Sequence, residues 1–228
     1  GYHALETILE KGLRKISPDA LAQRLQRGDA IVLDTRPSAL FTSGFVPGAI
    51  SIGLDGRFAE WAGSLLSFDQ PLFLVTEPGK EEESVVRLAR VGFDKIEGCL
   101  DGGFAAWLAA GKPTDMIIDV EADELAMDLP HDPHLMVLDV RKPAEYGEGH
   151  ITGALNLPLG DLNDPASMAN LEDQHNLYLH CAGGYRSIIA ASLLKRQGIH
   201  NLRNVSGGWK AIKEQQGIPI EKEASLLN

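Results

Sequence analysis

The chain contains very little cysteine, which excludes several classes of protein. Cys99 and Cys181 are the only cysteines among 228 residues, so a disulfide framework and a zinc cluster built on thiolates are excluded. This scarcity favours a reducing, cytoplasmic setting, in which a free thiol can act as a nucleophile. Each cysteine can therefore be judged on its own surroundings.

Basic charge and long apolar runs are also scarce. The 21 Lys and Arg face 32 Asp and Glu, which gives a formal net charge of −11. A nucleic-acid surface needs clustered Lys and Arg, so we expect no nucleic-acid partner. No apolar stretch reaches the ~20 residues that span a bilayer, and no secretory signal opens the chain, so we expect no membrane association. Because the first residue is Gly1 rather than Met, we expect a processed, tagged or excised piece.

An internal repeat sets the domain organisation. Residues 31–36 (IVLDTR) match residues 136–141 (MVLDVR) at an offset of 136 − 31 = 105. This period is too long for a solenoid unit and indicates two tandem domains of similar fold. A helical pattern precedes the first repeat, and we expect it to pack on one domain or on upstream sequence. The predicted divisions are a helical lead-in at 1–16, a first domain at 17–113 and a second domain at 114–228.

Short β-branched runs alternate with helical patterns in both repeats. Ser17 and Pro18 predict the cap and first turn of a helix, and Gly198 predicts the end of a helix over 187–197. The alternation predicts an α/β fold, with a mostly parallel sheet and helices on both of its faces. Ligands of such sheets bind at the carboxyl ends of the strands, so the strand-to-helix loops are the place to look for chemistry. The strands predicted in the second repeat are 135–140, 154–157, 176–180 and 202–205.

One such loop, residues 180–187 (HCAGGYRS), carries the predicted chemistry. A strand leads into Cys181, and the glycines let successive N–H groups converge on one centre. The helix that opens near Arg186 adds unsatisfied N–H groups and partial positive charge, and Arg186 supplies a full cation. These features favour a thiolate and make Cys181 the candidate nucleophile; a buried, inert cysteine beside a glycine turn is the alternative. The other predicted loop residues are Ala182, Gly183, Gly184, Tyr185 and Ser187.

The motifs of both repeats resemble the rhodanese (sulfurtransferase) family, over residues 17–220. The resemblance implies that Cys181 takes up a sulfane sulfur as a persulfide and passes it to a nucleophile, without a cofactor. Thiosulfate or small persulfides would be the donors, and Arg186 would stabilise the incoming anion. No spacing of His, Cys, Asp and Glu indicates a metal site. In the second repeat the resemblance rests on Asp139–Arg141, Glu145–Tyr146, Gly149–Ala154, Cys181–Arg186 and Val205–Trp209; in the first it rests on Asp34–Arg36, Gly44–Ala49 and Leu100–Trp107.

The same resemblance assigns roles to residues around the loop. It implies that Asp139 and Arg141, with Glu145 nearby, form an ion-paired network that braces the active loop rather than acting directly. His180 precedes the nucleophile, but adjacent strand residues point to opposite faces, so we expect it not to reach the sulfur. We expect His150 to be a packed structural histidine.

The length of the Cys181 loop and the degenerate first repeat bear on the alternative functions. Cys181 and Arg186 enclose four residues, as in sulfurtransferases, whereas related phosphatases and arsenate reductases enclose five. A non-enzymatic interaction or sulfur-sensing module is the alternative of a different class. The pairing of a degenerate copy with an intact one is similar to the carboxyl-terminal part of metallo-β-lactamase-fold/rhodanese fusion proteins, which would imply an upstream persulfide dioxygenase domain.

The first copy has no thiol in the equivalent loop, residues 75–84. Its counterpart of Cys181 falls at Thr76 or Glu77, and nothing there is expected to match Arg186. Glutamates at positions 77, 81, 82 and 83 place negative charge where an anion would bind. We therefore expect an inactive scaffolding or interaction domain, and we expect Cys99, which does not match Cys181, to be a buried structural thiol.

Overall fold

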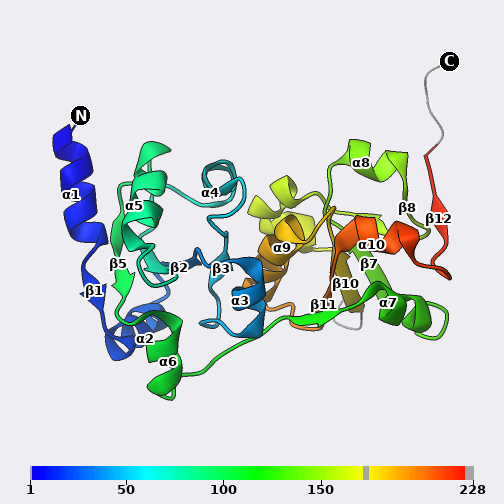
Figure 1. Ribbon diagram of the computed structural model, residues 1–228, viewed down its shortest axis with the longest axis horizontal. Helices are drawn as coiled ribbons and strands as arrows, with labels where there is room; N and C mark the ends of the chain where they lie inside the picture. Colours follow the sequence, from blue (N-terminus) through cyan, green and yellow to red (C-terminus); the bar gives the residue numbers. More distant parts are fainter. Residues whose placement is uncertain (1, 172–174, 224–228) are drawn as a thin grey trace. The chain divides into compact units, whose positions relative to one another are not determined.

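The chain folds as two compact units, residues 1–116 and 117–228 (Figure 1). The computed structural model describes residues 2–171 and 175–223. The division between the units falls in the connector that follows Pro113. None of the described helices is long and apolar enough to cross a membrane.

Helices and strands alternate along the first unit. The Ser17 hydroxyl accepts a hydrogen bond of 3.1 Å from the Ala20 N–H, and Pro18 begins the helix, which confirms the predicted cap. The described elements are α1 (Tyr2–Gly12), β1 (Lys15–Ile16), α2 (Pro18–Gln26), β2 (Ile31–Asp34), α3 (Ser38–Ser43), β3 (Ile50–Ser51), α4 (Phe58–Leu65), β4 (Leu72–Val75), α5 (Glu81–Arg90), β5 (Ile96–Leu100) and α6 (Gly103–Ala109).

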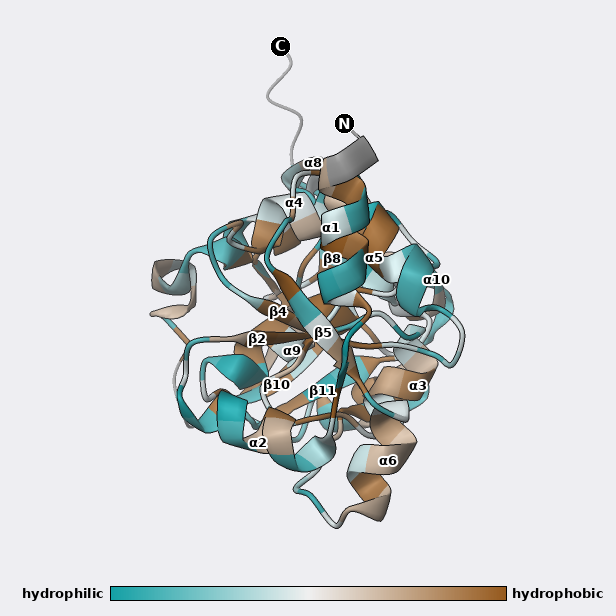
Figure 2. Ribbon diagram, turned by 90° about the vertical axis from the view of Figure 1, so that its left-hand side faces the viewer, coloured by the Kyte–Doolittle hydropathy of each residue, from teal (hydrophilic) through white to brown (hydrophobic). Residues whose placement is uncertain are grey.

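The sheet of the first unit has five parallel strands in the order β1-β5-β4-β2-β3. Every residue of β2 and β4 is buried, as their apolar sequences require in a sheet that helices cover on both faces. Figure 2 shows these strands in brown inside the unit, with helices of mixed hydropathy around them. The register pairs Asp34 at the end of β2 with Val75 at the end of β4.

The predicted lead-in helix, α1, packs on the first unit. It contacts α5 and β5, and Lys11 near its end forms an ion pair of 3.1 Å with Glu97 of β5. The carbonyl of Gly12 accepts a hydrogen bond from the Cys99 thiol at 3.3 Å. The helix therefore packs on β5, the strand next to the edge strand β1.

The second unit repeats this plan. Its five parallel strands follow the order β6-β11-β10-β7-β9, so each strand matches one of the first sheet, and a separate antiparallel pair joins β12 to β8. The described elements are β6 (Ile118–Val120), α7 (Ala122–Asp128), β7 (Leu135–Asp139), α8 (Pro143–Glu148), β8 (His150–Ile151), β9 (Leu155–Asn156), the 3-10 helices η1 (Leu159–Asn163) and η2 (Pro165–Met168), β10 (Asn176–His180), α9 (Tyr185–Arg196), β11 (Leu202–Val205), α10 (Gly208–Glu214) and β12 (Ile220–Glu221).

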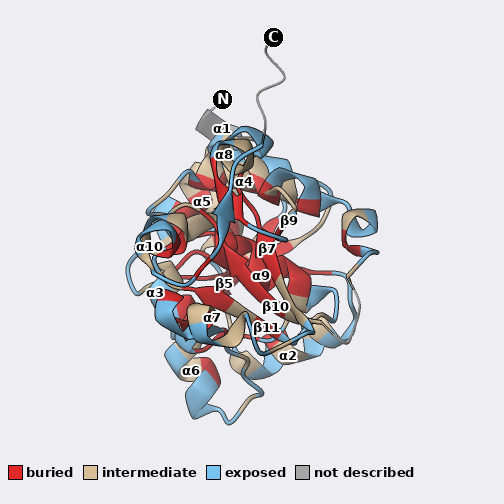
Figure 3. Ribbon diagram, turned by 90° about the vertical axis from the view of Figure 1, so that its right-hand side faces the viewer, coloured by how far each residue is buried: buried red, intermediate tan, exposed pale blue. Residues whose placement is uncertain are grey.

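Helix α9 holds the site in place because it is embedded in the protein. Residues 187–194 of this helix are all buried, and Figure 3 shows it red beside the buried strands β7 and β10. The register pairs Asp139 at the end of β7 with His180 at the end of β10. The loop between β10 and α9 thus opens at the carboxyl edge of the sheet, as expected for a ligand site of an α/β fold.

Candidate functional site

The candidate site is the loop that connects β10 to α9. Cys181 follows the strand directly, and the backbone turns at Gly184, whose φ of 124° lies in a region that favours glycine. This turn directs the Gly184 N–H at the Cys181 sulfur, with an N–Sγ distance of 3.0 Å. The loop therefore curls around the sulfur, as its two glycines predict.

The sulfur lies at the N-terminal end of a buried helix. Cys181 is 1% exposed, and its Sγ lies 3.5 Å from the Oγ of Ser187, whose hydroxyl also reaches the Gly184 carbonyl at 3.3 Å. The Gly184 N–H and the N-terminal partial charge of α9 both favour negative charge on the sulfur. These surroundings differ from those of Cys99, whose sulfur donates to a backbone carbonyl.

Arg186 holds the loop to α8 through Glu145. Its Nη1 and Nη2 atoms donate to the two Glu145 oxygens at 2.7 and 3.0 Å. The hydrogen bonds from Arg186 hold the pKa of Glu145 at about 2, and Glu145 in turn raises the pKa of Arg186. Arg186 thus ties the loop to α8, and its charge is matched by a carboxylate.

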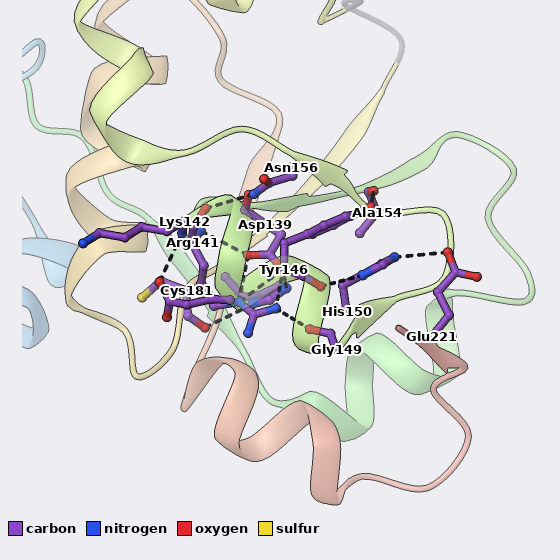
Figure 4. Close-up of polar contacts among 12 residues, drawn as sticks. Asp139, Arg141, Lys142, Tyr146, Gly149, His150, Ala154, Asn156, Cys181 and Glu221 are labelled. Carbon is purple, nitrogen blue, oxygen red and sulfur yellow. Dashed lines mark hydrogen bonds and ion pairs between the residues drawn. The ribbon is translucent and has the colours of Figure 1, made fainter. Parts of the chain in front are cut away.

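Asp139 and Arg141 form a buried clamp at the end of β7. Arg141 donates to both Asp139 oxygens, with a shortest contact of 2.7 Å, and its Nη2 also donates to the Gly149 carbonyl at 2.7 Å (Figure 4). Its guanidinium lies 4.5 Å from the centre of the Trp209 ring. Because the buried Asp139 carboxylate accepts on both oxygens and Arg141 also donates to the Gly149 carbonyl, the clamp fixes where the strand ends. The ion pair that the resemblance implies is thus present, and its bracing of the Cys181 loop stays a prediction.

The two histidines of the site have different surroundings. His150 stacks on Tyr146, and its Nε2 lies 3.1 Å from Glu221 of β12 (Figure 4), so it is the packed histidine that the sequence predicts. His180 is fully buried, with its Nδ1 3.0 Å from the Cys181 carbonyl oxygen. Among the described residues its ring nitrogens meet that carbonyl and Asp139, not the sulfur.

Comparison with known proteins decides the family. The family model described as "Rhodanese-like domain" matches residues 17–110 and again residues 121–215. The chain belongs to the rhodanese-like domain family. Both repeats are matched, including the one that lacks the thiol, and each matched segment lies within one compact unit.

Individual relatives of these rhodanese-like domains have names related to sulfur. A putative sulfur carrier protein of Bacillus subtilis is 37% identical over 93 residues, which are 41% of this chain and 48% of that protein. A sulfurtransferase of Allochromatium vinosum is 30% identical over 105 residues, 46% of this chain and 95% of that protein. The chain thus spans about half of the first relative and nearly all of the second. Among solved structures, a rhodanese-like domain from Anabaena is 32% identical, with a TM-score of 0.43, and covers 50% of this chain and 85% of that one.

The first rhodanese-like domain keeps the clamp but not the thiol. Arg36 donates to Asp34 at 2.7 Å and to the Gly44 carbonyl at 2.8 Å, and it lies 4.8 Å from the ring of Phe104, which takes the place of Trp209. Burial raises the pKa of Asp34, although Arg36 opposes this shift. Because the first domain has this clamp without a cysteine at the loop, the clamp contributes to the fold independently of the thiol.

Strand register identifies Thr76 as the counterpart of Cys181. Val75 pairs with Asp34 as His180 pairs with Asp139, so the next residue, Thr76, takes the cysteine's place. Glu77, the other sequence candidate, lies one position further along the loop. The first domain therefore has a hydroxyl at the end of the strand, where the second has its sulfur.

The helix ends correct one prediction about the first loop. Gly92 and Gly198 both follow their helices with positive φ, at an offset of 198 − 92 = 106. This register places Lys80 where the second domain has Arg186, whereas the sequence suggested no counterpart. The first loop encloses three residues between Thr76 and Lys80, one fewer than the second. The offset of 105 that holds in the strands hides this match.

A cavity of about 270 Å³ lies at the first loop. Lys80 at its wall forms an ion pair of 3.3 Å with Glu83, so its charge is matched within the cavity. Two of the four glutamates singled out from the sequence, Glu77 and Glu83, line it, which makes it a poor place for an anion. The lining residues are Thr35, Pro37, Leu54, Asp55, Glu77, Lys80 and Glu83.

Cys99 is the buried structural thiol that the sequence predicts. It is 1% exposed, its sulfur donates to the Gly12 carbonyl, and burial raises its pKa to about 11. Both cysteines are free. In the part of the chain that the structure describes, no three His, Cys, Asp or Glu side chains cluster as metal ligands would.

Sequence reasoning missed how α10 contacts the loop. The backbone N–H of Trp209 donates to the Cys181 carbonyl at 2.7 Å, and a Cβ on Gly208 would lie 2.5 Å from the same oxygen. The Gly-Gly-Trp motif was visible in the repeat but had no role. Strands β10 and β11 are parallel neighbours, so the loops that follow them meet at the same edge of the sheet. The prediction of two strands followed by these loops was therefore the signal that could have indicated the contact.

Proposed function

We propose that the second rhodanese-like domain is a sulfurtransferase that moves sulfane sulfur through a persulfide on Cys181. The observation that carries this proposal is the Gly184 N–H at 3.0 Å from the Cys181 sulfur, in a loop of four residues at the start of α9. The names of the Allochromatium and Bacillus relatives, a sulfurtransferase and a putative sulfur carrier protein, support transfer of sulfur in general.

In the first half-reaction Cys181 would attack the outer sulfur of thiosulfate or of a small persulfide. A new S–S bond forms at Cys181 while the S–S bond of the donor breaks, and the leaving group departs as sulfite or a thiolate with the bonding electron pair. The enzyme retains the outer sulfur as a persulfide anion. The amides from Ala182 to Ser187 would surround that anion.

In the second half-reaction a thiophilic acceptor would collect the sulfur. Sulfite, cyanide or a thiolate attacks the outer sulfur of the persulfide, the S–S bond to Cys181 breaks, and the Cys181 thiolate is regenerated. No net oxidation or reduction takes place, and the two half-reactions need no cofactor. Stabilisation of its negative charge by the loop would make the Cys181 thiolate a good leaving group in this step.

A non-enzymatic rhodanese-fold module that binds a partner or senses sulfur is the second candidate. The first domain favours it, because that domain keeps the fold and the Asp34–Arg36 clamp with Thr76 in place of a thiol. The second domain has the cysteine, the turn at Gly184 and the helix start of a reactive loop, which favours catalysis. A phosphatase is disfavoured, because the loop of four residues makes a small ring of amides suited to a single sulfur.

The cellular setting is part of the proposal. Two free cysteines suit a reducing compartment such as the cytoplasm. The family match covers rhodanese-like domains, so an upstream persulfide dioxygenase domain stays a prediction. Small sulfur-containing anions or thiol persulfides are the proposed partners.

Assay of sulfur transfer with matched cysteine variants tests the proposal. Wild type, Cys181→Ser and Cys99→Ser would each be supplied with thiosulfate or glutathione persulfide, with cyanide or sulfite as acceptor. We expect Cys181→Ser to lose about 10³-fold or more of the activity, because the nucleophile is gone, and Cys99→Ser to keep it. Intact mass should show one added sulfur in wild type and in Cys99→Ser alone.

Two outcomes would count against this reading. Transfer that survives in Cys181→Ser, or a wild type that neither turns over nor gains a sulfur, excludes the proposed mechanism. A wild type that gains sulfur on Cys181 but never passes it on supports the sensing module instead.

A further inference from the structure

The backbone carbonyl of Cys181 receives two hydrogen bonds. The Trp209 N–H donates to it at 2.7 Å, and His180 Nδ1 lies 3.0 Å from the same oxygen. Since a carbonyl oxygen only accepts, the proton of the neutral imidazole is on Nδ1. Donors from the end of β10 and the start of α10 thus converge on the peptide that begins the catalytic loop.

The other ring nitrogen of His180 has no donor. Its Nε2 lies 3.5 Å from Asp139 Oδ2, and it has no hydrogen-bond partner among the described residues. Burial lowers the pKa of His180, which leaves this nitrogen as an acceptor facing a carboxylate that Arg141 already holds. A buried acceptor without a partner costs stability, so the fold alone gives no reason to keep a histidine here.

The first domain shows that the fold does not need this histidine. Val75 stands in the same register position, beside the same kind of Asp–Arg clamp. The carbonyl of Thr76 also lacks the docking seen in the second domain. A Cβ on Gly103 would lie 3.5 Å from it, against 2.5 Å for Gly208 and the Cys181 carbonyl. In the described chain no backbone hydrogen bond joins the Thr76 carbonyl to the start of α6.

The histidine and the docked carbonyl therefore occur together, in the domain that carries the thiol. We propose that His180 is a positioning residue for sulfur transfer: by donating from Nδ1 to the Cys181 carbonyl, it fixes the Cys181–Ala182 peptide and keeps the loop curled with the Gly184 N–H on the sulfur. This inference rests on the proposed function. The side chain acts through the backbone and does not touch the reacting sulfur.

Three substitutions separate the hydrogen bond from packing. Asparagine places its amide nitrogen near the position of Nδ1, so His180→Asn keeps the donor to the carbonyl. Glutamine places its amide nitrogen near Nε2, where it can donate to Asp139 but not to the carbonyl. His180→Val copies the residue that the first domain uses. Far-UV circular dichroism and thermal unfolding would show that each variant is folded.

We expect kcat for sulfur transfer to fall about tenfold in His180→Gln and His180→Val, with KM for the donor within about twofold of wild type, because a displaced loop misplaces the nucleophile. We expect His180→Asn to stay within about threefold of wild type. Folded Gln and Val variants with wild-type kcat would overturn the inference, and so would an Asn variant as slow as the Val variant.

A second readout keeps this test independent of sulfur transfer. Iodoacetamide alkylation of Cys181 at pH 7, followed by intact mass, reports the state of the loop even if wild type transfers no sulfur. Cys181→Ser supplies the background, which is low because burial raises the pKa of Cys99 to about 11. We expect the alkylation rate in the Gln and Val variants to differ from that of wild type, and the Asn variant to keep the wild-type rate. Equal alkylation rates in wild type and the three variants would overturn the positioning role. If wild type transfers no sulfur while the alkylation rates still differ, the proposed function is overturned and the positioning role is not.

Discussion

A guanidinium that is ion-paired with one carboxylate offers less net positive charge to a second anion. Arg186 gives both terminal nitrogens to Glu145, at 2.7 and 3.0 Å. The local positive charge that the sequence promises next to Cys181 is therefore largely neutralised. The amides of the loop, rather than a side-chain cation, are left to stabilise a bound sulfur anion.

The Glu145–Arg186 pair gives stability a defined pH dependence. The pKa of Glu145 is lowered from 4.5 to about 2, so its contribution is complete above pH 4.5 and is lost as the pH falls through 2. Glu145→Gln should lower the free energy of unfolding at pH 7 by about 1 kcal/mol, a value reduced for the solvent-exposed part of the pair. Urea denaturation at pH 7, 4 and 3 should show the difference from wild type shrinking as the pH falls.

Glu148, exposed on the same helix, supplies the control for this experiment. Glu148→Gln removes one negative charge from α8 without touching Arg186, so its stability should follow that of wild type at all three pH values. A difference between wild type and Glu145→Gln that does not change with pH would show that the pair contributes through packing instead.

At the scale of elements, the contact between α10 and the loop is close and can be tested. Gly208 has a φ of 56°, and a Cβ there would lie 2.5 Å from the Cys181 carbonyl oxygen and 2.7 Å from the Ala182 oxygen. Gly208→Ala should push the loop away from α10 and lower sulfur transfer by about tenfold or more. It should also destabilise the protein by more than the ~1 kcal/mol that a left-handed alanine costs.

The first domain offers the matched substitution. Gly103 has a φ of 64°, but a Cβ there would lie 3.5 Å from the Thr76 oxygen, an ordinary contact. Gly103→Ala should therefore carry the backbone cost of about 1 kcal/mol alone and leave sulfur transfer unchanged. Thermal unfolding and the transfer assay on both variants make the comparison. Equal losses of activity would disprove a specific role for the contact at Gly208.

Elements with a strong local signal could be predicted from the sequence. β10 and β11 begin and end at the predicted residues, because buried apolar residues mark both strands: Leu177, Tyr178 and Leu179 in β10, and Leu202 and Val205 in β11. α9 begins at Tyr185, two residues before the predicted start, since the turn at Gly184 completes the loop earlier than spacing suggests. The edge strand β6 escaped prediction because Ile118 and Asp119 are exposed and show no alternation.

The site was predictable only in part. A cysteine before two glycines and a helix start is a local pattern, and it located the loop. The Arg186–Glu145 pair, by contrast, spans 41 positions in the sequence, and its partner was assigned to the wider network around Arg141. The hydrogen bond from Trp209 to the Cys181 carbonyl depends on strand order, which no local pattern encodes. Contacts between loops at the edge of a sheet can be predicted only when the order of the strands is known.

At the scale of the whole molecule, net charge affects how a donor arrives. A protein with a charge of −11 repels a dianion at long range, and salt screens this repulsion. The KM for thiosulfate should therefore fall by about two- to threefold as salt rises from ~20 to ~200 mM. Steady-state kinetics at several salt concentrations would measure it, with an uncharged organic trisulfide as the control donor. A KM that is level or rises with salt would contradict this expectation.

The two domains differ by one residue in loop length, and that difference has an evolutionary consequence. Thr76→Cys would place a thiol at the end of β4, but three residues, not four, would still separate it from Lys80. Base substitutions cannot add the missing residue, and Val75 and the acidic cavity would remain. Thr76→Cys alone would therefore not rebuild the Cys181 loop in the first domain, because an insertion is needed as well.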